Sequence, residues 1–269
     1  MITSYVINMQ RSGERMRAMA ARMDALGLPY ERLPAVDGAE LTDAQVAEFI
    51  AARPLEGSGD SFSSGPRVWT RANIGCFLSH YAAWQIAADA AAPYTAIFED
   101  DMHLSDVLPA LLKQTQWLPG GCSVVRLEPS YNRVRLGAKV TDVAGRALRR
   151  VEPSPHQHCW PVCAGALILS REAARRLLAA EARWHTMADI FLFGWNESPM
   201  ARQLQTYQLS PAACIQDKFF HAAPEQIVFT STIDAPLTAV QKQRSAHWKA
   251  KATAALRLAQ GYRKVPFAP

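Results

Sequence analysis

Residues 99–101, Glu-Asp-Asp, end a short apolar run that begins at Tyr94. Tyr, Thr, Ile and Phe favour a β-strand, and Pro93 is typical of a strand boundary. In an extended segment alternate side chains share a face, so Glu99 and Asp101 are expected to point one way and Asp100 the other. Two carboxylates on one face suit a hard divalent ion, Mn²⁺ or Mg²⁺, which also takes phosphate oxygens from a substrate. The alternative interpretation is a solvated acidic turn.

Asp189 is an isolated acid followed directly by the apolar residues 190–193. A carboxyl group in apolar surroundings has a raised pKa, which suits a general base. The competing interpretation of Asp189 is a residue that caps a helix.

Basic residues follow the first expected strand, residues 4–8, at the start of the first expected helix. Arg11 and Arg15 could contact phosphates there, or they could be exposed helix arginines. The turn is not glycine-rich, and neither the dinucleotide-binding pattern nor the P-loop pattern occurs. Asp37 follows the second expected strand, where an acid could bind a ribose, although Asp-Gly is also a common turn. His80 lies beside the apolar face of a long helix and is either catalytic or a hydrogen-bonded structural residue.

The elements that must position these residues alternate between strand and helix. Helical spacing covers 12–26, 42–52, 70–90 and 171–182, with Ser12 and Ser170 as expected caps. Strands are expected at 4–8, 28–35, 94–99, 122–128, 164–169 and in the region 209–217. Residues 54–66 are rich in Gly, Ser and Pro and predict a loop, and residues 130–158 predict hairpins or loops over the sheet. This alternation predicts an α/β fold whose acids lie at the carboxyl ends of strands, where such folds bind ligands.

The composition is that of a globular protein, with 269 residues of which 49% are hydrophobic and 20% charged. We expect a catalytic domain at 1–235 and a basic helical tail at 236–269. No apolar run is long enough for a transmembrane helix, and no secretory signal is expected at the start. Five cysteines, without a Cys-x-x-Cys pattern, indicate reduced thiols and a cytosolic protein.

The net charge of +5 arises in the last part of the chain. Residues 241–269 contain seven basic residues and no acid, and the rest of the chain has 22 basic against 24 acidic residues. Such a segment favours an anionic partner, either a membrane surface or a nucleic acid.

Several of these stretches together resemble glycosyltransferase family 25, the lipooligosaccharide galactosyltransferase family, which also contains collagen galactosyltransferases. The matching stretches, in order along the chain, are Val6–Arg11 with Glu14-Arg15, Asn73–His80 with Trp84, Ala96–Asp101, Val125–Glu128, His158-Cys159, Gly165-Ala166, Ala188-Asp189, Ser210-Pro211 with Gln216, and Val265–Phe267. The resemblance covers nearly the whole chain.

The resemblance implies a GT-A-like fold, a central mixed sheet flanked by helices, together with a UDP-sugar donor and inversion at the anomeric carbon. It places Asn8, Arg11 and Arg15 at the nucleotide, and Glu99 and Asp101 on Mn²⁺ or Mg²⁺. Asp100 would face the ribose or the sugar, and the donor-sugar pocket would be lined by Ser79, His80, Arg126 and Glu128. Asp189 would be the base, with Glu128 as the alternative base.

The first functional hypothesis is therefore an inverting, metal-dependent transferase of lipopolysaccharide core assembly. It would use UDP-galactose or UDP-glucose on the cytoplasmic face of the inner membrane, with a glycan or lipid-linked acceptor and the basic tail on anionic lipid. The competing hypotheses are a metal-dependent phosphohydrolase or nuclease and a non-catalytic glycan-binding scaffold. For the transferase we expect no nucleic-acid partner.

Overall fold

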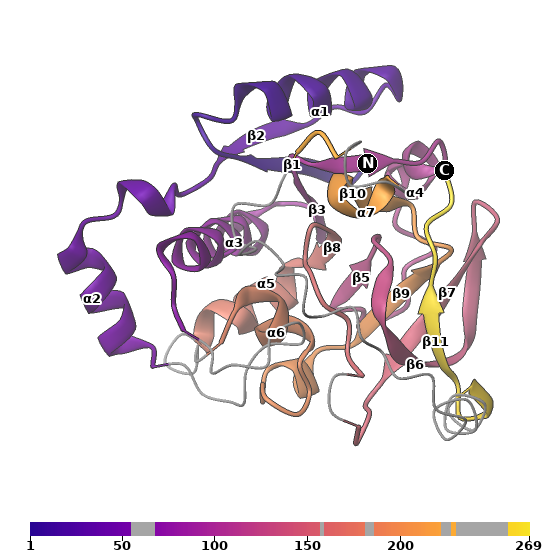
Figure 1. Cartoon of the computed structure of the whole chain (residues 1–269). Helices are drawn as coiled ribbons and strands as arrows, with labels where there is room; N and C mark the ends of the chain where they lie inside the picture. The colour runs from indigo at the N-terminus through magenta and orange to yellow at the C-terminus, as the bar shows by residue number, and fades with distance from the viewer. Residues whose placement is uncertain (55–67, 157–158, 181–185, 222–226, 230–257) are drawn as a thin grey trace.

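The computed structural model describes residues 1–54, 68–156, 159–180, 186–221, 227–229 and 258–269. Within these residues, one mixed sheet has the strand order β11-β6-β7-β9-β5-β8-β3-β1-β2 (Figure 1). Its strands are β1 (Thr3–Asn8), β2 (Glu31–Pro34), β3 (Tyr94–Glu99), β5 (Val124–Arg126), β6 (Ser130–Val143), β7 (Arg146–Glu152), β8 (Ala166–Ser170), β9 (Thr206–Ser210) and β11 (Tyr262–Val265). A second, two-stranded sheet pairs β4 (Met102–Leu104) with β10 (Cys214–Gln216).

Helices lie on both sides of the large sheet (Figure 1). They are α1 (Gly13–Ala25), α2 (Asp43–Ala52), α3 (Arg71–Asp89), α4 (Leu108–Lys113), α5 (Arg171–Ala179), α6 (Ala188–Phe193) and α7 (Asp217–Phe220), with short 3₁₀ helices at η1 (Gly38–Glu40) and η3 (Ala201–Gln203). The expected α/β class with a mixed central sheet is confirmed. No helix in the described part of the chain combines the length and the apolar character needed to cross a bilayer.

Alternating side chains along the buried strands fill two separate core layers. Ile97 of β3 belongs to the layer that contains Trp84 of α3, together with side chains of α5 and α6. Its neighbours Ala96 and Phe98 belong to the other layer, with Met19 of α1 and side chains of α4. Because successive side chains of a strand point to opposite faces, a continuous apolar strand such as β3 is buried on both sides.

One of the two predicted helix caps is confirmed. Ser170 accepts a hydrogen bond from the Ala173 backbone nitrogen, and Thr42, which was not predicted as a cap, forms a reciprocal capping box with Gln45. Ser12 also occupies the cap position of α1, but its side chain makes no capping bond. The expected cap at Ser12 is therefore wrong, although the helix begins where predicted.

Two parts of the chain differ from the sequence prediction. The hairpin predicted within residues 130–158 exists as β6 and β7, but it lies within the central sheet and extends it, instead of covering it. Residues 262–265, predicted as part of a helical tail, form strand β11 and pair with β6. Unpaired β6 would expose a row of backbone donors and acceptors, which β11 satisfies. The predicted domain boundary at 235–236, the predicted loop at 54–66 apart from its first residue, and most of the basic residues after 236 lie outside the described residues.

The end of the chain is held by buried contacts. Tyr262 and Val265 are both 2% exposed, and the Tyr262 hydroxyl lies 2.8 Å from Ser154 Oγ. Arg146 donates to the backbone oxygens of Ala212 and Ala268, at 2.8 and 2.9 Å. The last strand is therefore an integral part of the sheet.

Replacement of Tyr262 by alanine tests this arrangement. We expect Tyr262→Ala to lower the free energy of unfolding by about 3–5 kcal/mol, because a buried aromatic side chain is lost. The exposed neighbour Arg263 provides the control, and Arg263→Ala should change stability by less than about 0.5 kcal/mol. Urea unfolding measures both, and equal midpoints for the two variants would show that residues 262–265 are a dispensable tail.

Candidate active site

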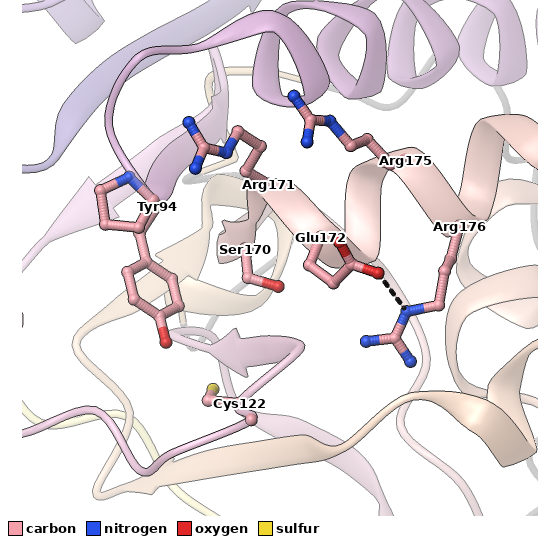
Figure 2. A pocket seen from close by; sticks show the side chains of 9 residues that line it. Tyr94, Cys122, Ser170, Arg171, Glu172, Arg175 and Arg176 are labelled. Atoms are coloured by element: carbon pink, nitrogen blue, oxygen red, sulfur yellow. Dashed lines mark ion pairs between the residues drawn. The ribbon is translucent and has the colours of Figure 1, made fainter.

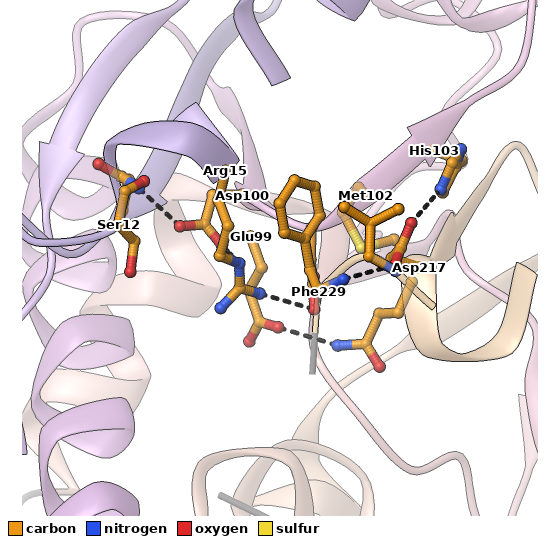
Figure 3. Close-up of polar contacts among 12 residues, drawn as sticks. Ser12, Arg15, Glu99, Asp100, Met102, His103, Asp217 and Phe229 are labelled. Atoms are coloured by element: carbon orange, nitrogen blue, oxygen red, sulfur yellow. Dashed lines mark hydrogen bonds and ion pairs between the residues drawn. The ribbon is translucent and has the colours of Figure 1, made fainter. Parts of the chain in front are cut away.

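The acidic residues 99–101 lie at the carboxyl end of β3, and the strand ends at Glu99. Asp100 and Asp101 form a turn, so the alternation assumed from an extended segment does not continue past Glu99. The expectation that Glu99 and Asp101 share a face opposite Asp100 is therefore wrong. Instead Asp100 and Asp101 contact the same arginine, and Glu99 contacts a different set of residues (Figure 3).

Arg15 of α1 bridges the two aspartates. Its Nε lies 2.9 Å from Asp100 Oδ1 and its Nη2 lies 2.8 Å from Asp101 Oδ2. Asn8, at the end of β1, donates to Asp100 Oδ2 at 2.6 Å and to the Ser12 backbone oxygen at 3.0 Å. The first strand–turn–helix unit therefore neutralises and orients these acids.

Glu99 is held by residues of α3 and β10. Its Oε1 lies 3.1 Å from His80 Nε2, and its Oε2 accepts a hydrogen bond from Gln216 Nε2 at 2.9 Å. Cys76, one helical turn before His80, places its Sγ within 4.8 Å of the ligand atoms of both partners. Burial lowers the pKa of His80, but its contacts with Cys76 and Glu99 outweigh burial and raise that pKa to about 10. Burial likewise favours a neutral Glu99, but His80 holds the pKa of Glu99 below its usual range, so the two form an ion pair.

Gly165 joins Glu99 to Glu128 through its backbone. The Gly165 oxygen accepts from the Glu99 nitrogen at 2.7 Å, and the Gly165 nitrogen donates to Glu128 Oε1 at 2.9 Å. A Cβ at this position would lie 3.0 Å from Met102 Sδ and 3.1 Å from Gln216 Nε2. Glycine therefore lets the backbone join the two glutamates without displacing these neighbouring side chains.

Burial makes this site unfavourable for negative charge. Burial, with the neighbouring charge of Glu99, raises the pKa of Asp101 to about 7. Burial also raises the pKa of Glu128 to about 8, against the effect of Arg126, and Glu99 and Asp101 add to the increase. The three carboxylates thus influence one another, and a cation among them would offset both burial and repulsion.

The same residues contain oxygen atoms that fit a cation. Among the described residues, Asp101 Oδ1, Glu128 Oε2 and Gln216 Oε1 are buried and accept no hydrogen bond. Hard divalent cations take oxygen ligands of this kind, and so the chemistry of these oxygens fits Mn²⁺ or Mg²⁺. Both oxygens of Glu99 already have partners, which makes Asp101 the better placed of the two predicted ligands.

Three predicted donor-binding residues lie at the edge of this site or support it. Arg11 and Asp37 form an ion pair, which holds the pKa of Asp37 below its usual range. Asp37 also accepts from the Ala39 nitrogen and thus caps η1. Ser79 donates to the Gly75 backbone oxygen at 2.7 Å and accepts from the Val36 nitrogen at 2.9 Å, which ties α3 to the segment after β2.

Arg126 and Asp189 both hold the backbone segment 162–163. Arg126 is fully buried, and its guanidinium donates to the backbone oxygens of Cys163 and Val162, at 2.5 and 2.9 Å. Asp189 Oδ2 accepts from the Cys163 nitrogen at 2.9 Å, and its Oδ1 accepts from the Ile190 nitrogen at 2.8 Å. Both side chains therefore position the segment that leads to Gly165.

Gln216, Cys76 and Gly165 belong to the site but were not among the predicted site residues. Cys76 was detectable, because residues four apart on a helix share a face and His80 was already a candidate. Gln216 and Gly165 are distant in sequence from the acids that they contact, and the signal that could have found them is their place in stretches that resemble the family, Gly165-Ala166 and Ser210-Pro211 with Gln216.

A pocket lies at the opposite end of β3 from the acids, beside Tyr94 and Ser170 (Figure 2). Arg171 and Arg175 border it, but they donate to backbone oxygens of residues 88–91 at the end of α3. Glu172 pairs with Arg176 at 3.5 Å. The arginines are thus engaged within the protein, and this pocket is separate from the candidate active site.

The sequence matches the model of glycosyltransferase family 25, described as an LPS biosynthesis protein family, over residues 1–192. The chain belongs to glycosyltransferase family 25. It is similar to the lacto-N-neotetraose biosynthesis glycosyltransferases LgtB of Neisseria gonorrhoeae and LgtE of Neisseria meningitidis serogroup B, with 30% identity over 226 residues and 26% over 224 residues. Each alignment covers 80% of this chain and 74% of the relative.

Solved structures similar to this glycosyltransferase include mouse xyloside xylosyltransferase 1 in its apo form, with 12% identity and a TM-score of 0.40. That alignment covers 78% of this chain and 85% of the mouse chain. A glucose-1-phosphate thymidylyltransferase from Bacillus anthracis, described as putative, covers 78% of this chain and 87% of its own, with 12% identity and a TM-score of 0.37.

The buried glutamate of this glycosyltransferase gives a pH-dependent stability. The folded chain retains a proton on Glu128 up to about pH 8, whereas the unfolded chain loses it near 4.5. In chelator, the free energy of unfolding should therefore fall as the pH rises from 5 to 8, by on the order of 3 kcal/mol. Glu128→Gln should reduce this decrease, and the exposed Glu31→Gln should not. Urea unfolding across this pH range measures the slope, and an unchanged slope in Glu128→Gln would contradict the assignment.

Proposed function

We propose that this glycosyltransferase is a metal-dependent, inverting enzyme that transfers a hexose, galactose from UDP-galactose, to a sugar hydroxyl of a lipopolysaccharide or lipooligosaccharide core or a similar glycan. The observation that carries the proposal is that Asp101, Glu128 and Gln216, which lie around Glu99 at the carboxyl end of β3, each have a buried oxygen without a donor among the described residues. Such a group suits a divalent cation and the hydroxyls of a sugar. Its position at strand ends is where α/β sheets bind ligands.

The donor side of the site is formed by the first strand–turn–helix unit. Asp101 and Glu99 would hold Mn²⁺ or Mg²⁺, and Arg11 and Arg15 would face the phosphates, with Asn8 and Asp37 toward the nucleoside. When bound, the ion would offset the negative charge that develops on the leaving diphosphate. Arg15 already contacts Asp100 and Asp101, so it can hold these acids in place before the donor binds.

Glu128 is the better supported of the two candidate bases. Burial raises its pKa to about 8, and its Oε2 has no donor among the described residues. A general base works best with a pKa near the operating pH. Both oxygens of Asp189, by contrast, accept backbone hydrogen bonds. We therefore assign proton removal from the acceptor hydroxyl to Glu128, and positioning of the segment 162–163 to Asp189.

The acceptor proposal rests on the relatives. LgtB and LgtE are named for the biosynthesis of lacto-N-neotetraose, an oligosaccharide, which supports a glycan acceptor for this chain. The basic segment 241–269 supports an anionic membrane surface as a further partner, and Arg263 and Lys264 are exposed on β11. The proposed location is accordingly the cytoplasmic face of the inner membrane.

The donor is tested by thermal unfolding with UDP-galactose and UDP-glucose, each with and without Mn²⁺. We expect a metal-dependent increase of the midpoint that is larger with UDP-galactose, because binding to the folded state stabilises it. Asp101→Asn should abolish the metal-dependent part and lower kcat/KM for transfer by about 100-fold or more. Asp142→Asn, an exposed carboxylate in β6, is the control.

A larger shift with UDP-glucose would reassign the donor within the same reaction class. A folded protein without any shift from UDP compounds would contradict the donor site and favour the hydrolase or scaffold hypotheses. Hydrolysis of phosphate esters that depends on Asp101 would support the hydrolase. Glycan binding that survives Asp101→Asn, without any transfer, would support the scaffold.

The base is tested by comparing Glu128→Gln with Asp189→Asn. Glu128→Gln should lower kcat by about 10²–10⁴-fold, because general base catalysis is lost, while the UDP-dependent midpoint shift remains. Asp189→Asn retains an acceptor for the Cys163 nitrogen, so its kcat should fall less than tenfold. Initial rates of transfer measure both, and a larger loss in Asp189→Asn than in Glu128→Gln would reverse the assignment.

A further inference from the structure

Three potential metal ligands from two parts of the chain meet beside the acidic turn. They are His103 in β4, Asp217 at the start of α7 and His221 directly after α7. The Nε2 atoms of His103 and His221 lie 2.7 and 3.2 Å from the same oxygen, Asp217 Oδ1. All three ligand atoms lie within 4.8 Å of one another. Two imidazole nitrogens and one carboxylate oxygen thus converge on one point.

Asp217 is oriented by its backbone neighbours. Its side chain is 1% exposed, and its Oδ2 accepts hydrogen bonds from the nitrogens of Val228 and Phe229, both at 2.9 Å (Figure 3). These bonds leave Oδ1 facing the two imidazoles. Metal-binding carboxylates are commonly held in this way by hydrogen bonds to their other oxygen.

The 3.2 Å between His221 Nε2 and Asp217 Oδ1 agrees with ligands that share one ion, whereas His103 Nε2 and Asp217 Oδ1, at 2.7 Å, are in hydrogen-bond contact and must move apart when an ion binds. Zinc binds histidine nitrogen and carboxylate oxygen at about 2.0–2.2 Å, which places neighbouring ligand atoms about 3.3 Å apart in a tetrahedral site. The side chains of His103 and His221 are 17% and 21% exposed, so an ion and a water ligand can reach the cluster. Arg22 Nη2 lies 3.4 Å from His103 Nε2 and opposes a cation there, but Arg22 Nη1 is anchored on the Met102 oxygen at 3.0 Å.

We propose that His103, Asp217 and His221 bind a zinc ion, separate from the Mn²⁺ or Mg²⁺ of the transfer reaction. Imidazole ligands suit Zn²⁺, whereas carboxylate and carbonyl oxygens suit Mn²⁺ and Mg²⁺, so the two groups of side chains select different ions.

The zinc ion would join β4 to α7 and to residues 228–229. Phe229 faces the Arg15 guanidinium, whose carbon lies 5.9 Å from the ring centroid. The Asp217 backbone nitrogen donates a hydrogen bond to the Asp101 backbone oxygen at 2.9 Å. The zinc site would thereby stabilise one wall of the candidate active site without taking part in the chemistry.

The test uses the full chain after treatment with a chelator. Zn²⁺ at a hundredfold excess over its dissociation constant should raise the midpoint of thermal unfolding by about 5 °C or more, and Mg²⁺ should give no shift that depends on His103 or His221. His103→Gln and His221→Gln should each abolish this shift. His156→Gln is the matched control, since His156 contacts the Tyr262 ring and no carboxylate of the cluster, and it should retain the shift.

A second variant separates this site from Cys76, His80 and Glu99, whose ligand atoms also lie within 4.8 Å of one another. Cys76→Ser should retain the zinc shift, and Co²⁺ bound in place of Zn²⁺ should show no charge-transfer band from a thiolate. The proposal is overturned if Zn²⁺ does not bind, if binding survives both histidine changes, or if Cys76→Ser abolishes it. If His103→Gln does not fold, His221→Gln decides alone. UDP-sugar binding is measured separately, so failure of either proposal leaves the other intact.

Discussion

Arg15 contacts two adjacent carboxylates at the end of a strand that is buried on both faces. Three consecutive acids in such a position repel one another and lose hydration, and both effects disfavour folding unless each charge finds a partner. Arg15 forms ion pairs with Asp100 and Asp101, and His80 forms an ion pair with Glu99. Helices α1 and α3, which carry these partners, lie on opposite sides of the sheet, so the acids join the two core layers at this point.

The residues that face the acids are arranged by backbone contacts more than by side-chain pairs. Gly165 bonds to both Glu99 and Glu128, and the segment before it is held by the buried guanidinium of Arg126 and by Asp189. Because Arg126 lies over the Phe193 ring at 4.6 Å, helix α6 also contributes to this support. The acidic site thus depends on a backbone segment whose own polar groups are satisfied by side chains that make no contact with the acids of β3.

The short strand β4 continues directly from the acidic turn and pairs with β10. This pairing brings Gln216 to Glu99 and brings Asp217 beside Asp101. It also aligns His103 with the start of α7. One small sheet therefore connects the oxygen-rich group suited to a hard cation with the histidine-rich group suited to zinc.

The sequence by itself determined the elements that repeat a local pattern. The apolar run of β3, the helical spacing of α3 and the cap Ser170 depend on neighbours within a few residues, and the structure confirms them. The acids of β3 were identified in the same way, as was their place at a strand end. The resemblance of the chain to its family rests on the order of short motifs along the sequence, and this order can be recognised without knowing which residues are in contact.

Only the tertiary structure decided which side chains meet. Asp100 and Asp101 form a turn in which both contact Arg15, 85 and 86 residues earlier in the chain, so the alternation of an extended strand ends at Glu99. Gln216 reaches Glu99, and Asp217 meets His103, across more than 100 residues. The place of β11 likewise depends on the open edge of β6. Such long-range pairings leave no periodic signal, because they arise from chain topology and from the need to satisfy buried charges and backbone groups.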